Sequence, residues 1–162
     1  MDEVPITLAG KSKLEAELEQ LIKVDREEIK VAIAEARELG DLKENAEYHA
    51  AKEKQGIIEG RIAQIQGILA RSRVVEVSKI KSNKIVFGAT VSLLDVSKNI
   101  NITYKIVGED ESEIRENKIS YNSPLGKALI GKEEGDTVIV KAPKGDVEYE
   151  VESFEFIDWK KI

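Results

Sequence analysis

A long proline-free stretch with apolar residues in helical spacing constrains the fold of this chain more than any other feature. Between Lys11 and Leu39 there is no proline, and apolar residues recur at steps of three, four and seven: Leu14, Leu18, Leu21, Ile22, Ile29, Ile33 and Ala36. This spacing places them on one face of an α-helix. A capping box of Ser12 and Glu15 could start the helix, while Thr7 is an equally good N-cap. The pattern predicts a long amphipathic helix whose start is open between these positions.

A second stripe of the same kind follows after a short connection. Gly40 ends the first run, and Asp41 can act as the N-cap of a new helix that begins at Leu42. The second stripe stops near Arg73 and consists of Ala46, Ala50, Ile58, Ile62, Ile65 and Leu69. A connection this short permits only an antiparallel reversal. We therefore predict a long antiparallel coiled-coil hairpin for residues 1–75, with the apolar residues as its scaffold.

The period of the pattern changes to two after Arg73. It is clearest in Asp146–Phe156 (DVEYEVESFEF), where apolar residues alternate with glutamates, as on a strand with one buried face. Further strand-like runs are Val74–Val77, Ile85–Val96 with a bulge at Gly88, Asn101–Val107 and Thr137–Lys141, and a turn at Pro143–Gly145 precedes the last strand. Pro124 to Ile130 has the pattern of a short helix that ends at Gly131. We predict a small β-rich domain for residues 80–162 and an α+β fold class.

The composition excludes several classes of function. The chain has 162 residues, no cysteine and a formal net charge of -6, so disulfides, thiolate chemistry and cysteine-based zinc sites are excluded. Tight binding to free nucleic acid is not expected, because it depends on Lys and Arg side chains that neutralise phosphates. The first residues contain no long apolar run, so we expect no membrane anchor and a cytoplasmic location. Any role on nucleic acid would then need a protein partner.

The predicted hairpin tip, Glu35–Gly56, holds the residues that could carry chemistry. Asp41 and Glu44 are three residues apart at the predicted start of the second helix, so both side chains can point from the same end of the arm. Glu47 adds a third carboxylate, and carboxylate oxygens are ligands that Mg²⁺ prefers. The alternative is structural, because Asp at an N-cap and Glu three residues later also stabilise a helix start. His49 has no histidine or cysteine as a co-ligand, which favours an exposed helical residue.

Several long segments resemble one known family. The run IAEARELGDLKENAEYHAAKEKQG, which ends at Gly56, is very similar to the tip of the bacterial GreA/GreB transcript-cleavage factors. The likeness continues through IVFGATV (Ile85–Val91), TYKIVGEDE (Thr103–Glu111) and ISYNSPLGKALIGKEEGDTVIV (Ile119–Val140). It covers nearly the whole chain and is nearer to the GreA branch. The resemblance implies an N-terminal antiparallel coiled coil, a C-terminal domain with an FKBP-like fold, and a role in transcription elongation.

The resemblance also implies a partner and a mechanism. In this family the globular domain docks on the rim of the secondary channel of bacterial RNA polymerase, and the coiled-coil tip reaches inward to the active centre. Asp41 and Glu44 match the family's two essential acids, which help to hold the second Mg²⁺ and its water during hydrolysis of backtracked nascent RNA. The isolated protein should bind Mg²⁺ weakly, because two carboxylates alone rarely hold this ion. Such a protein stimulates cleavage by the polymerase and is not an enzyme by itself.

Further candidate residues follow from the same resemblance. Arg37 and Lys52 match a basic spot that the family uses towards the RNA 3′ end, although Lys52 stands where we expect Arg and lacks its bidentate phosphate geometry. Both could also be ordinary charges on a solvated helix face. Asn45 and Tyr48 match the tip motif and are candidates for RNA contact. Tyr48 could equally be a packing residue that stiffens the turn.

A loop of the second domain matches the segment with which the family is thought to dock on polymerase. Asn122, Ser123 and Pro124 lie in this loop, but a turn before a helix would explain the same residues. The last residues, Trp159–Ile162, extend beyond the usual end of the family, and nothing in the sequence assigns them a function.

Three other functions stay open on the sequence. An inhibitor could enter the same channel without promoting cleavage, although it would not need the spacing of Asp41 and Glu44. A peptidyl-prolyl isomerase is suggested only by the FKBP-like domain, and fold alone is weak support for function. A coiled-coil chaperone or passive scaffold would not depend on carboxylates at the tip.

Overall fold

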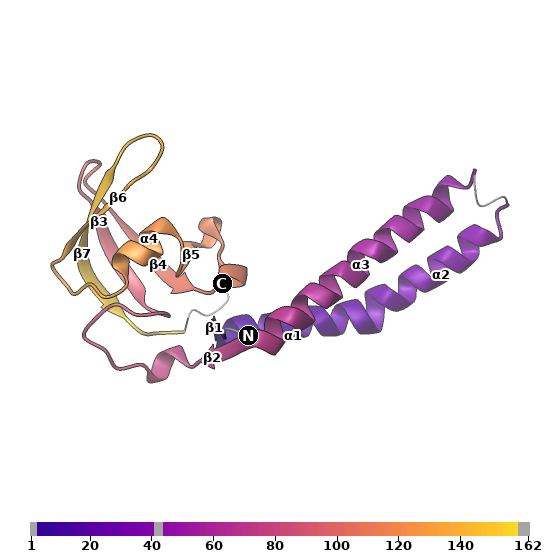
Figure 1. Ribbon diagram of the computed structural model, residues 1–162, viewed down its shortest axis with the longest axis horizontal. Coiled ribbons are helices and arrows are strands. Elements are labelled where there is room, and N and C mark those ends of the chain that lie inside the picture. Colours follow the sequence, from indigo (N-terminus) through magenta and orange to yellow (C-terminus); the bar gives the residue numbers. More distant parts are fainter. Residues whose placement is uncertain (1–2, 41–43, 159–162) are drawn as a thin grey trace. The chain divides into compact units, whose positions relative to one another are not determined.

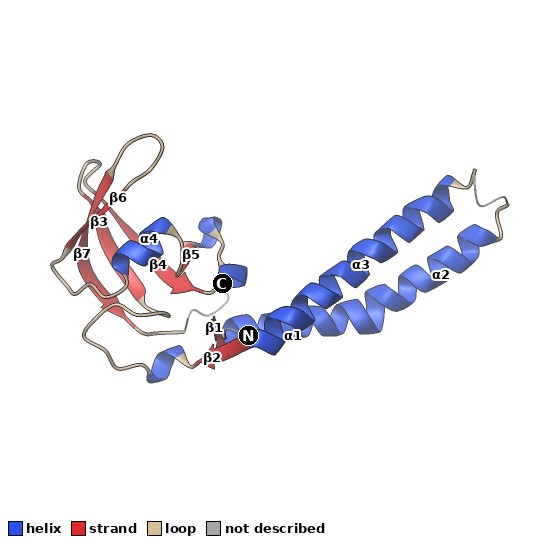
Figure 2. Ribbon diagram, in the orientation of Figure 1, coloured by secondary structure: helices blue, strands red, loops and turns tan. Residues whose placement is uncertain are grey.

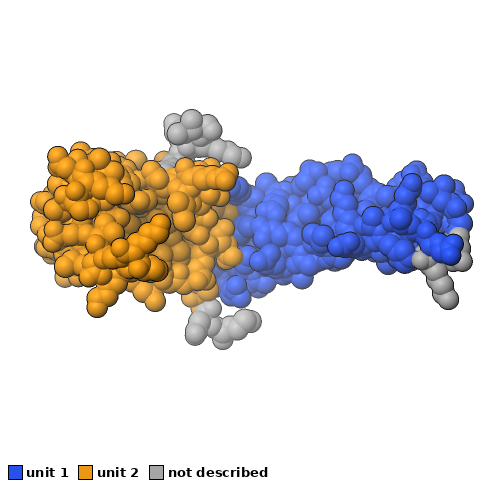
Figure 3. Space-filling view, turned by 90° about the horizontal axis from the view of Figure 1, so that it is seen from above, with its two compact units in different colours: residues 1–2, 11–72 blue, residues 3–10, 73–162 orange. Residues whose placement is uncertain are grey.

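The computed structural model describes residues 3–40 and 44–158, and the chain divides into two compact units. One unit holds Lys11–Ser72, and the other holds Glu3–Gly10 together with Arg73 and the residues after it (Figure 3). The first is helical and the second is built around a β-sheet (Figure 2). The predicted α+β fold class is confirmed. In the described part of the chain no helix is long and apolar enough to cross a membrane.

A helical hairpin makes up the first unit, apart from the first three residues of the hairpin, which belong to the second unit (Figure 1). Its outgoing arm consists of α1 (Leu8–Gln20), the π-helical turn η1 (Leu21–Asp25) and α2 (Arg26–Arg37), and its returning arm is α3 (Ala46–Arg71). The buried apolar residues of the arms are Leu14, Leu21, Ile29, Ile33, Ala36, Ile58, Ile62, Ile65 and Ile68. The predicted hairpin is confirmed. Its start lies at Leu8, where Thr7 Oγ1 accepts a hydrogen bond from the Gly10 N–H at 3.0 Å, so the capping box at Ser12 is wrong.

The outgoing arm contains a π-helical turn that helical spacing alone does not predict. In η1 the N–H of Arg26 bonds to the carbonyl of Leu21, five residues earlier. Leu21, Asp25, Ile29 and Ile33 follow at three successive steps of four, whereas a coiled coil alternates three and four. Such an insertion into the seven-residue pattern unwinds a coiled coil locally, and the wider π turn absorbs the extra residue. Both η1 and α2 therefore keep their contacts with α3.

Ion pairs also join the arms, outside the apolar stripe. Arg61 on α3 donates to both carboxylate oxygens of Glu17 on α1, at 2.6 and 2.9 Å, and Arg26 pairs with Glu59 at 2.9 Å. The hydrogen bond from Arg61 lowers the pKa of Glu17. Because these side chains are partly exposed, solvent screening keeps their contribution to stability small. Each pair joins a residue of the outgoing arm to a residue of α3, so a shift in the register of the arms would break both pairs.

The second unit is built on a five-stranded sheet with the strand order β5-β4-β3-β7-β6. Its strands are β3 (Thr90–Asp95), β4 (Ile100–Val107), β5 (Lys118–Ser120), β6 (Thr137–Val140) and β7 (Val147–Glu155). Neighbouring strands are antiparallel, except that β4 and β5 are parallel. The connections contain the helix α4 (Pro124–Leu129) and the 3₁₀ turns η2 (Val77–Lys79), η3 (Glu109–Glu111) and η4 (Ile114–Glu116). The predicted short helix and the predicted last hairpin are confirmed.

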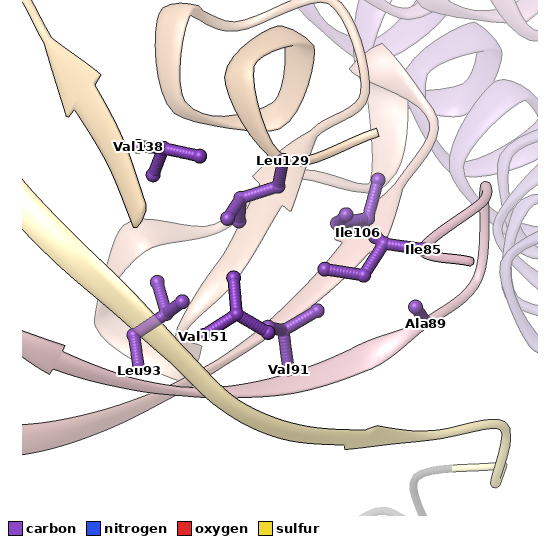
Figure 4. Close-up of a cluster of buried hydrophobic side chains, with 8 residues drawn as sticks. All are labelled: Ile85, Ala89, Val91, Leu93, Ile106, Leu129, Val138 and Val151. Atoms are coloured by element: carbon purple, nitrogen blue, oxygen red, sulfur yellow. The ribbon is translucent and has the colours of Figure 1, made fainter. Parts of the chain in front are cut away.

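One apolar cluster packs α4 against the sheet (Figure 4). It consists of Ile85, Ala89, Val91, Leu93, Ile106, Leu129, Val138 and Val151, and each is at most 4% exposed. Leu129 extends from α4 towards the side chains of β3 and β7. Packing therefore fixes α4, and with it the turn that precedes this helix and contains the candidate docking residues.

Parts of the second unit differ from the prediction. Residues 85–89 precede the strand, and a hydrogen bond from the Ala89 N–H to the Val86 carbonyl closes a turn there. Gly88, with a φ of +93°, belongs to this turn and not to a bulge. The run predicted at Val74–Val77 is β2 (Ser72–Val75), which pairs with β1 (Val4–Thr7) in a separate two-stranded sheet.

Candidate functional site at the hairpin tip

The outgoing arm ends in a tight turn. Helix α2 ends at Arg37, and beyond it the N–H of Leu39 donates a hydrogen bond to the carbonyl of Ala36 at 3.1 Å. Gly40 has a φ of +133°, a region that glycine adopts without the steric cost of a side chain. Gly40 therefore ends this arm as predicted, and Leu39 beside it is 66% exposed.

The returning arm begins later than predicted. Asn45 is the N-cap of α3, and its side-chain oxygen accepts a hydrogen bond from the Tyr48 N–H at 3.0 Å. The backbone of Asn45 is extended, with φ -90° and ψ 94°, so a continuous helix from Leu42 is wrong. The helix begins at Ala46, and the Asn45 side chain accepts a hydrogen bond from one of the first N–H groups, which have no partner within the helix. Asp41, which we expected as the cap, lies outside the described residues.

Glu44 stands directly before this cap and is exposed. It is therefore not the third residue of a helix, and a capping box does not explain it. Within the described residues, its carboxylate makes no hydrogen bond or ion pair. Glu44 lines a surface hollow of ≈ 410 Å³ with Leu39, Asn45, Ala46 and Glu47. The carboxylate is thus accessible and has no structural task in the described tip.

The tip can supply oxygen ligands to a metal ion. Glu44 and Glu47 place carboxylates at the hollow, and carboxylate oxygen is the donor type that Mg²⁺ prefers. Residues 3–40 and 44–158 contain no group of three or more His, Cys, Asp or Glu side chains that could hold a metal ion. A magnesium ion bound at the hollow would therefore need additional ligands.

Two contacts cross the tip from one arm to the other. Asn45 Nδ2 donates a hydrogen bond to the Ala36 carbonyl, which also accepts from the Leu39 N–H at the end of α2. The guanidinium carbon of Arg37 lies 5.7 Å from the centre of the Tyr48 ring, within the range of a cation–π contact. Tyr48 is half-buried, and its ring meets His49 edge-on with 5.6 Å between centroids. Asn45 and Tyr48 therefore help to hold the tip together.

The basic candidates come from different arms. Arg37 and Lys52 are both exposed, and Lys52 lies one turn after Tyr48 on α3. Lys52 Nζ donates to Gln55 Oε1 at 3.3 Å, a surface contact that leaves the ammonium accessible to an anion. The structure thus brings the two charges to the neighbourhood of Tyr48. His49 is exposed, as we expected.

The candidate docking residues form the turn that leads into α4. Ser123 is the N-cap: its Oγ accepts from the Gly126 N–H at 3.1 Å and donates to the Ser120 carbonyl at 2.6 Å. Asn122 donates to a glutamate of η3 and accepts from the Ser120 hydroxyl. Pro124 occupies the first turn of the helix and is exposed. Asn122 and Ser123 therefore have roles within the turn, and Pro124 provides exposed surface.

Removal of the Ser123 cap is expected to destabilise the second unit modestly. Ser123→Ala leaves the Gly126 N–H without its acceptor and should lower the free energy of unfolding by about 1 kcal/mol. Ser123→Thr keeps the hydroxyl and should cost about 0.3 kcal/mol. Urea denaturation of both variants measures the difference. If Ser123→Ala unfolds at the wild-type midpoint, the hydroxyl is not a stabilising cap.

Residue types alone do not reveal two parts of the tip. The Ala36 carbonyl receives the Asn45 hydrogen bond, and a backbone carbonyl has no signature in the sequence. Leu39 follows Ala36 by three residues, so helical spacing places it on the buried face. Leu39 is nevertheless exposed, because it lies beyond Arg37, where α2 ends.

Comparison with known proteins matches both halves of the chain to one family. Residues 4–74 match the family described as transcription elongation factor, N-terminal, and residues 80–156 match transcription elongation factor, GreA/GreB, C-term. The chain is 54% identical over 158 residues to transcription elongation factor GreA of Thioalkalivibrio sulfidiphilus. The matched stretch covers 97% of this chain and 100% of that protein. The identity to GreA of Francisella tularensis subsp. novicida is also 54%, over 96% of this chain and 98% of that protein. The crystal structure of GreA factor homolog 1 of Thermus thermophilus is 30% identical and covers 94% of this chain and 99% of its own, with a TM-score of 0.44.

Proposed function

Because the chain belongs to the GreA/GreB family of transcription elongation factors, we propose that its hairpin tip enters RNA polymerase and stimulates cleavage of backtracked nascent RNA. The observation that carries the proposal is the exposed Glu44 carboxylate, which has no partner among the described residues. A carboxylate that neither caps a helix nor pairs with a described neighbour is available to a ligand from another molecule. At the tip of a hairpin that ligand can lie inside a partner.

The carboxylates of Asp41 and Glu44 are proposed to hold Mg²⁺ jointly with polymerase acids. When bound, the ion supplies the charge that activates a water for attack on the RNA backbone. Glu44 contributes an oxygen ligand and can orient the attacking water by accepting a hydrogen bond. Polymerase is proposed to supply the remaining ligands, because two carboxylates alone rarely hold Mg²⁺. In this proposal the polymerase carries out the cleavage, and the protein acts as its cofactor.

Arg37 and Lys52 are proposed to approach the RNA 3′ end. Support comes from their exposure on opposite arms: Arg37 contacts the Tyr48 ring, and Lys52 lies one helical turn after Tyr48. Lys52 would act as a point charge towards phosphate, without the bidentate fork of an arginine. Contact of Asn45 or Tyr48 with RNA stays a prediction, since both side chains already have contacts within the tip.

The second unit is proposed to dock on the rim of the secondary channel through Asn122, Ser123 and Pro124. The exposed ring of Pro124 and the turn held by the Ser123 cap offer a shaped and ordered surface to a partner. A protein that works on the polymerase in this way acts in the cytoplasm. The net charge of -6 supports a role through the polymerase and not through tight binding of free nucleic acid.

A stalled, backtracked polymerase complex with labelled RNA tests the proposal. Addition of the purified protein should shorten the RNA from its 3′ side, while the protein alone with Mg²⁺ should leave free RNA intact. Binding to the complex without RNA shortening would instead favour the channel-entering inhibitor. Magnesium-dependent RNA cleavage without polymerase would contradict the proposed role as a cofactor.

The same preparation separates the isomerase alternative. A peptidyl-prolyl isomerase would accelerate cis–trans exchange of a proline peptide, and this acceleration would not depend on the tip acids. We expect no acceleration. Activity of this kind together with unchanged RNA would replace the proposed function.

A further inference from the structure

One side chain at the tip bonds to both arms at once. The Asn45 oxygen accepts from the Tyr48 N–H within α3, and the Asn45 Nδ2 donates to the Ala36 carbonyl at the end of α2. The first bond is an ordinary N-cap. The second links residues nine apart in sequence, on either side of the connection between the arms.

These two bonds together require an amide. Ser and Asp are also good N-caps, because each offers an oxygen to the helix N–H groups. An ionised Asp has no donor for the Ala36 carbonyl. A Ser hydroxyl can accept and donate at once, as Ser123 does before α4, but its oxygen lies one bond nearer the backbone than the Asn45 amide nitrogen and so extends less far towards the other arm. Asn45 therefore makes one hydrogen bond, to the Ala36 carbonyl, that an N-cap does not require. A second link between the arms, from Arg37 to the Tyr48 ring, lies beside it.

We propose that Asn45 is a positioning residue that sets where Glu44 is presented to the polymerase active centre. This inference rests on the proposed function. Glu44 is bonded covalently to Asn45 and lies in the stretch whose ends the Asn45–Ala36 bond closes. Closing these ends reduces the number of conformations that the connection can adopt. Because effective catalysis needs ligands held close to their productive geometry, loss of this bond lowers the rate without removing a ligand.

Three variants of Asn45 separate the bridge from the cap. Asn45→Asp and Asn45→Ser keep a capping oxygen and lose the bond to Ala36, whereas Asn45→Ala loses both. In the backtracked-complex assay we expect Asn45→Asp and Asn45→Ser each to lower the maximal cleavage rate about tenfold. The protein concentration for half-maximal stimulation should stay at the wild-type value, because docking residues are unchanged. Gln66→Ser, on the exposed surface of α3 far along the chain from the tip, is the matched control and should cleave at the wild-type rate.

A distance measurement tests the bridge without polymerase. The chain has no cysteine, so Glu35→Cys and Lys54→Cys, which lie on the exposed surfaces of α2 and α3, can be spin-labelled specifically. The distribution of inter-label distances should broaden in Asn45→Asp and in Asn45→Ser relative to Asn45. Gln66→Ser should leave it unchanged.

The outcomes separate this inference from the proposed function. If Asn45→Asp and Asn45→Ser match the wild type in rate and distance distribution while Asn45→Ala does not, Asn45 is only a cap and the inference is overturned. A loss confined to Asn45→Asp would be an effect of charge and would overturn it as well. If the wild type itself does not stimulate cleavage, the proposed function fails, and so does the positioning role that rests on it.

Discussion

Asp41→Asn and Glu44→Gln are each expected to lower the maximal rate of polymerase-dependent RNA cleavage about a hundredfold. Each change keeps the size of the side chain and removes the formal charge with which a carboxylate holds a hard cation. Loss of one such interaction in a transition state commonly costs about 3 kcal/mol, which corresponds to this factor in rate. Single-turnover cleavage at saturating protein measures the effect. High Mg²⁺ should restore part of the rate, because it compensates for weaker binding of the ion.

Folding should not change in the same variants, and this separates a ligand from a helix cap. The cap of α3 is Asn45, so Glu44→Gln removes no bond of the helix start. We expect the free energy of unfolding of both variants to stay within about 0.5 kcal/mol of the wild type. Glu53→Gln removes one negative charge from the exposed surface of α3 and is the matched control for charge. Near wild-type cleavage by Asp41→Asn and Glu44→Gln would mean that these acids do not hold the ion.

The hairpin is predictable from the sequence because its apolar residues repeat at helical spacing. Which residues of α3 are buried near the tip is not predictable in this way. The stripe of α3 continues towards the tip through the half-buried residues Gln55, Ala51 and Tyr48, whereas Ala46 and Ala50 are exposed. The polar Gln55 interrupts the apolar pattern. For this reason the exposed residues Ala46 and Ala50 were wrongly predicted to continue the buried stripe. Only the structure resolves this ambiguity.

The start of α3 illustrates why local rules fail at this site. Asp41 and Asn45 are both good N-cap residues, and the sequence offers no local reason to prefer the later one. Asn45 has an additional bond to the Ala36 carbonyl in the other arm. A contact between arms is decided by tertiary structure and leaves no mark in the spacing of residues. The exposed position of Glu44 before the cap is a consequence of that choice.

In the second unit, too, elements with a local sequence signal were predicted and elements that depend on distant residues were not. The alternation in β7 and the turn before this strand are local signals, and they were sufficient to predict the last hairpin. Strand β5 has three residues, too few for a period to be recognised, and the pairing of β1 with β2 joins segments far apart in the chain. Gly88 has the positive φ that a glycine in a strand-like run suggests, yet turns and bulges share this requirement. Sequence therefore predicts that an irregularity is present and leaves its type undecided.

Leu129→Ala is expected to destabilise the second unit by about 3 kcal/mol, and its neighbour provides the control. Leu129 is fully buried in the core cluster, so removal of its side chain leaves a cavity that packed neighbours fill only partly. Ile130→Ala removes the same number of atoms from the next residue, which is 37% exposed, and should cost less than about 1 kcal/mol. Urea denaturation with a probe in the sheet measures both values.

Because α4 carries the turn proposed to dock, Leu129→Ala should also weaken binding to polymerase at temperatures where the unit begins to unfold. Equal stability of the two variants would mean that α4 does not depend on this core, and polymerase binding unaffected by unfolding of the second unit would place the docking surface elsewhere.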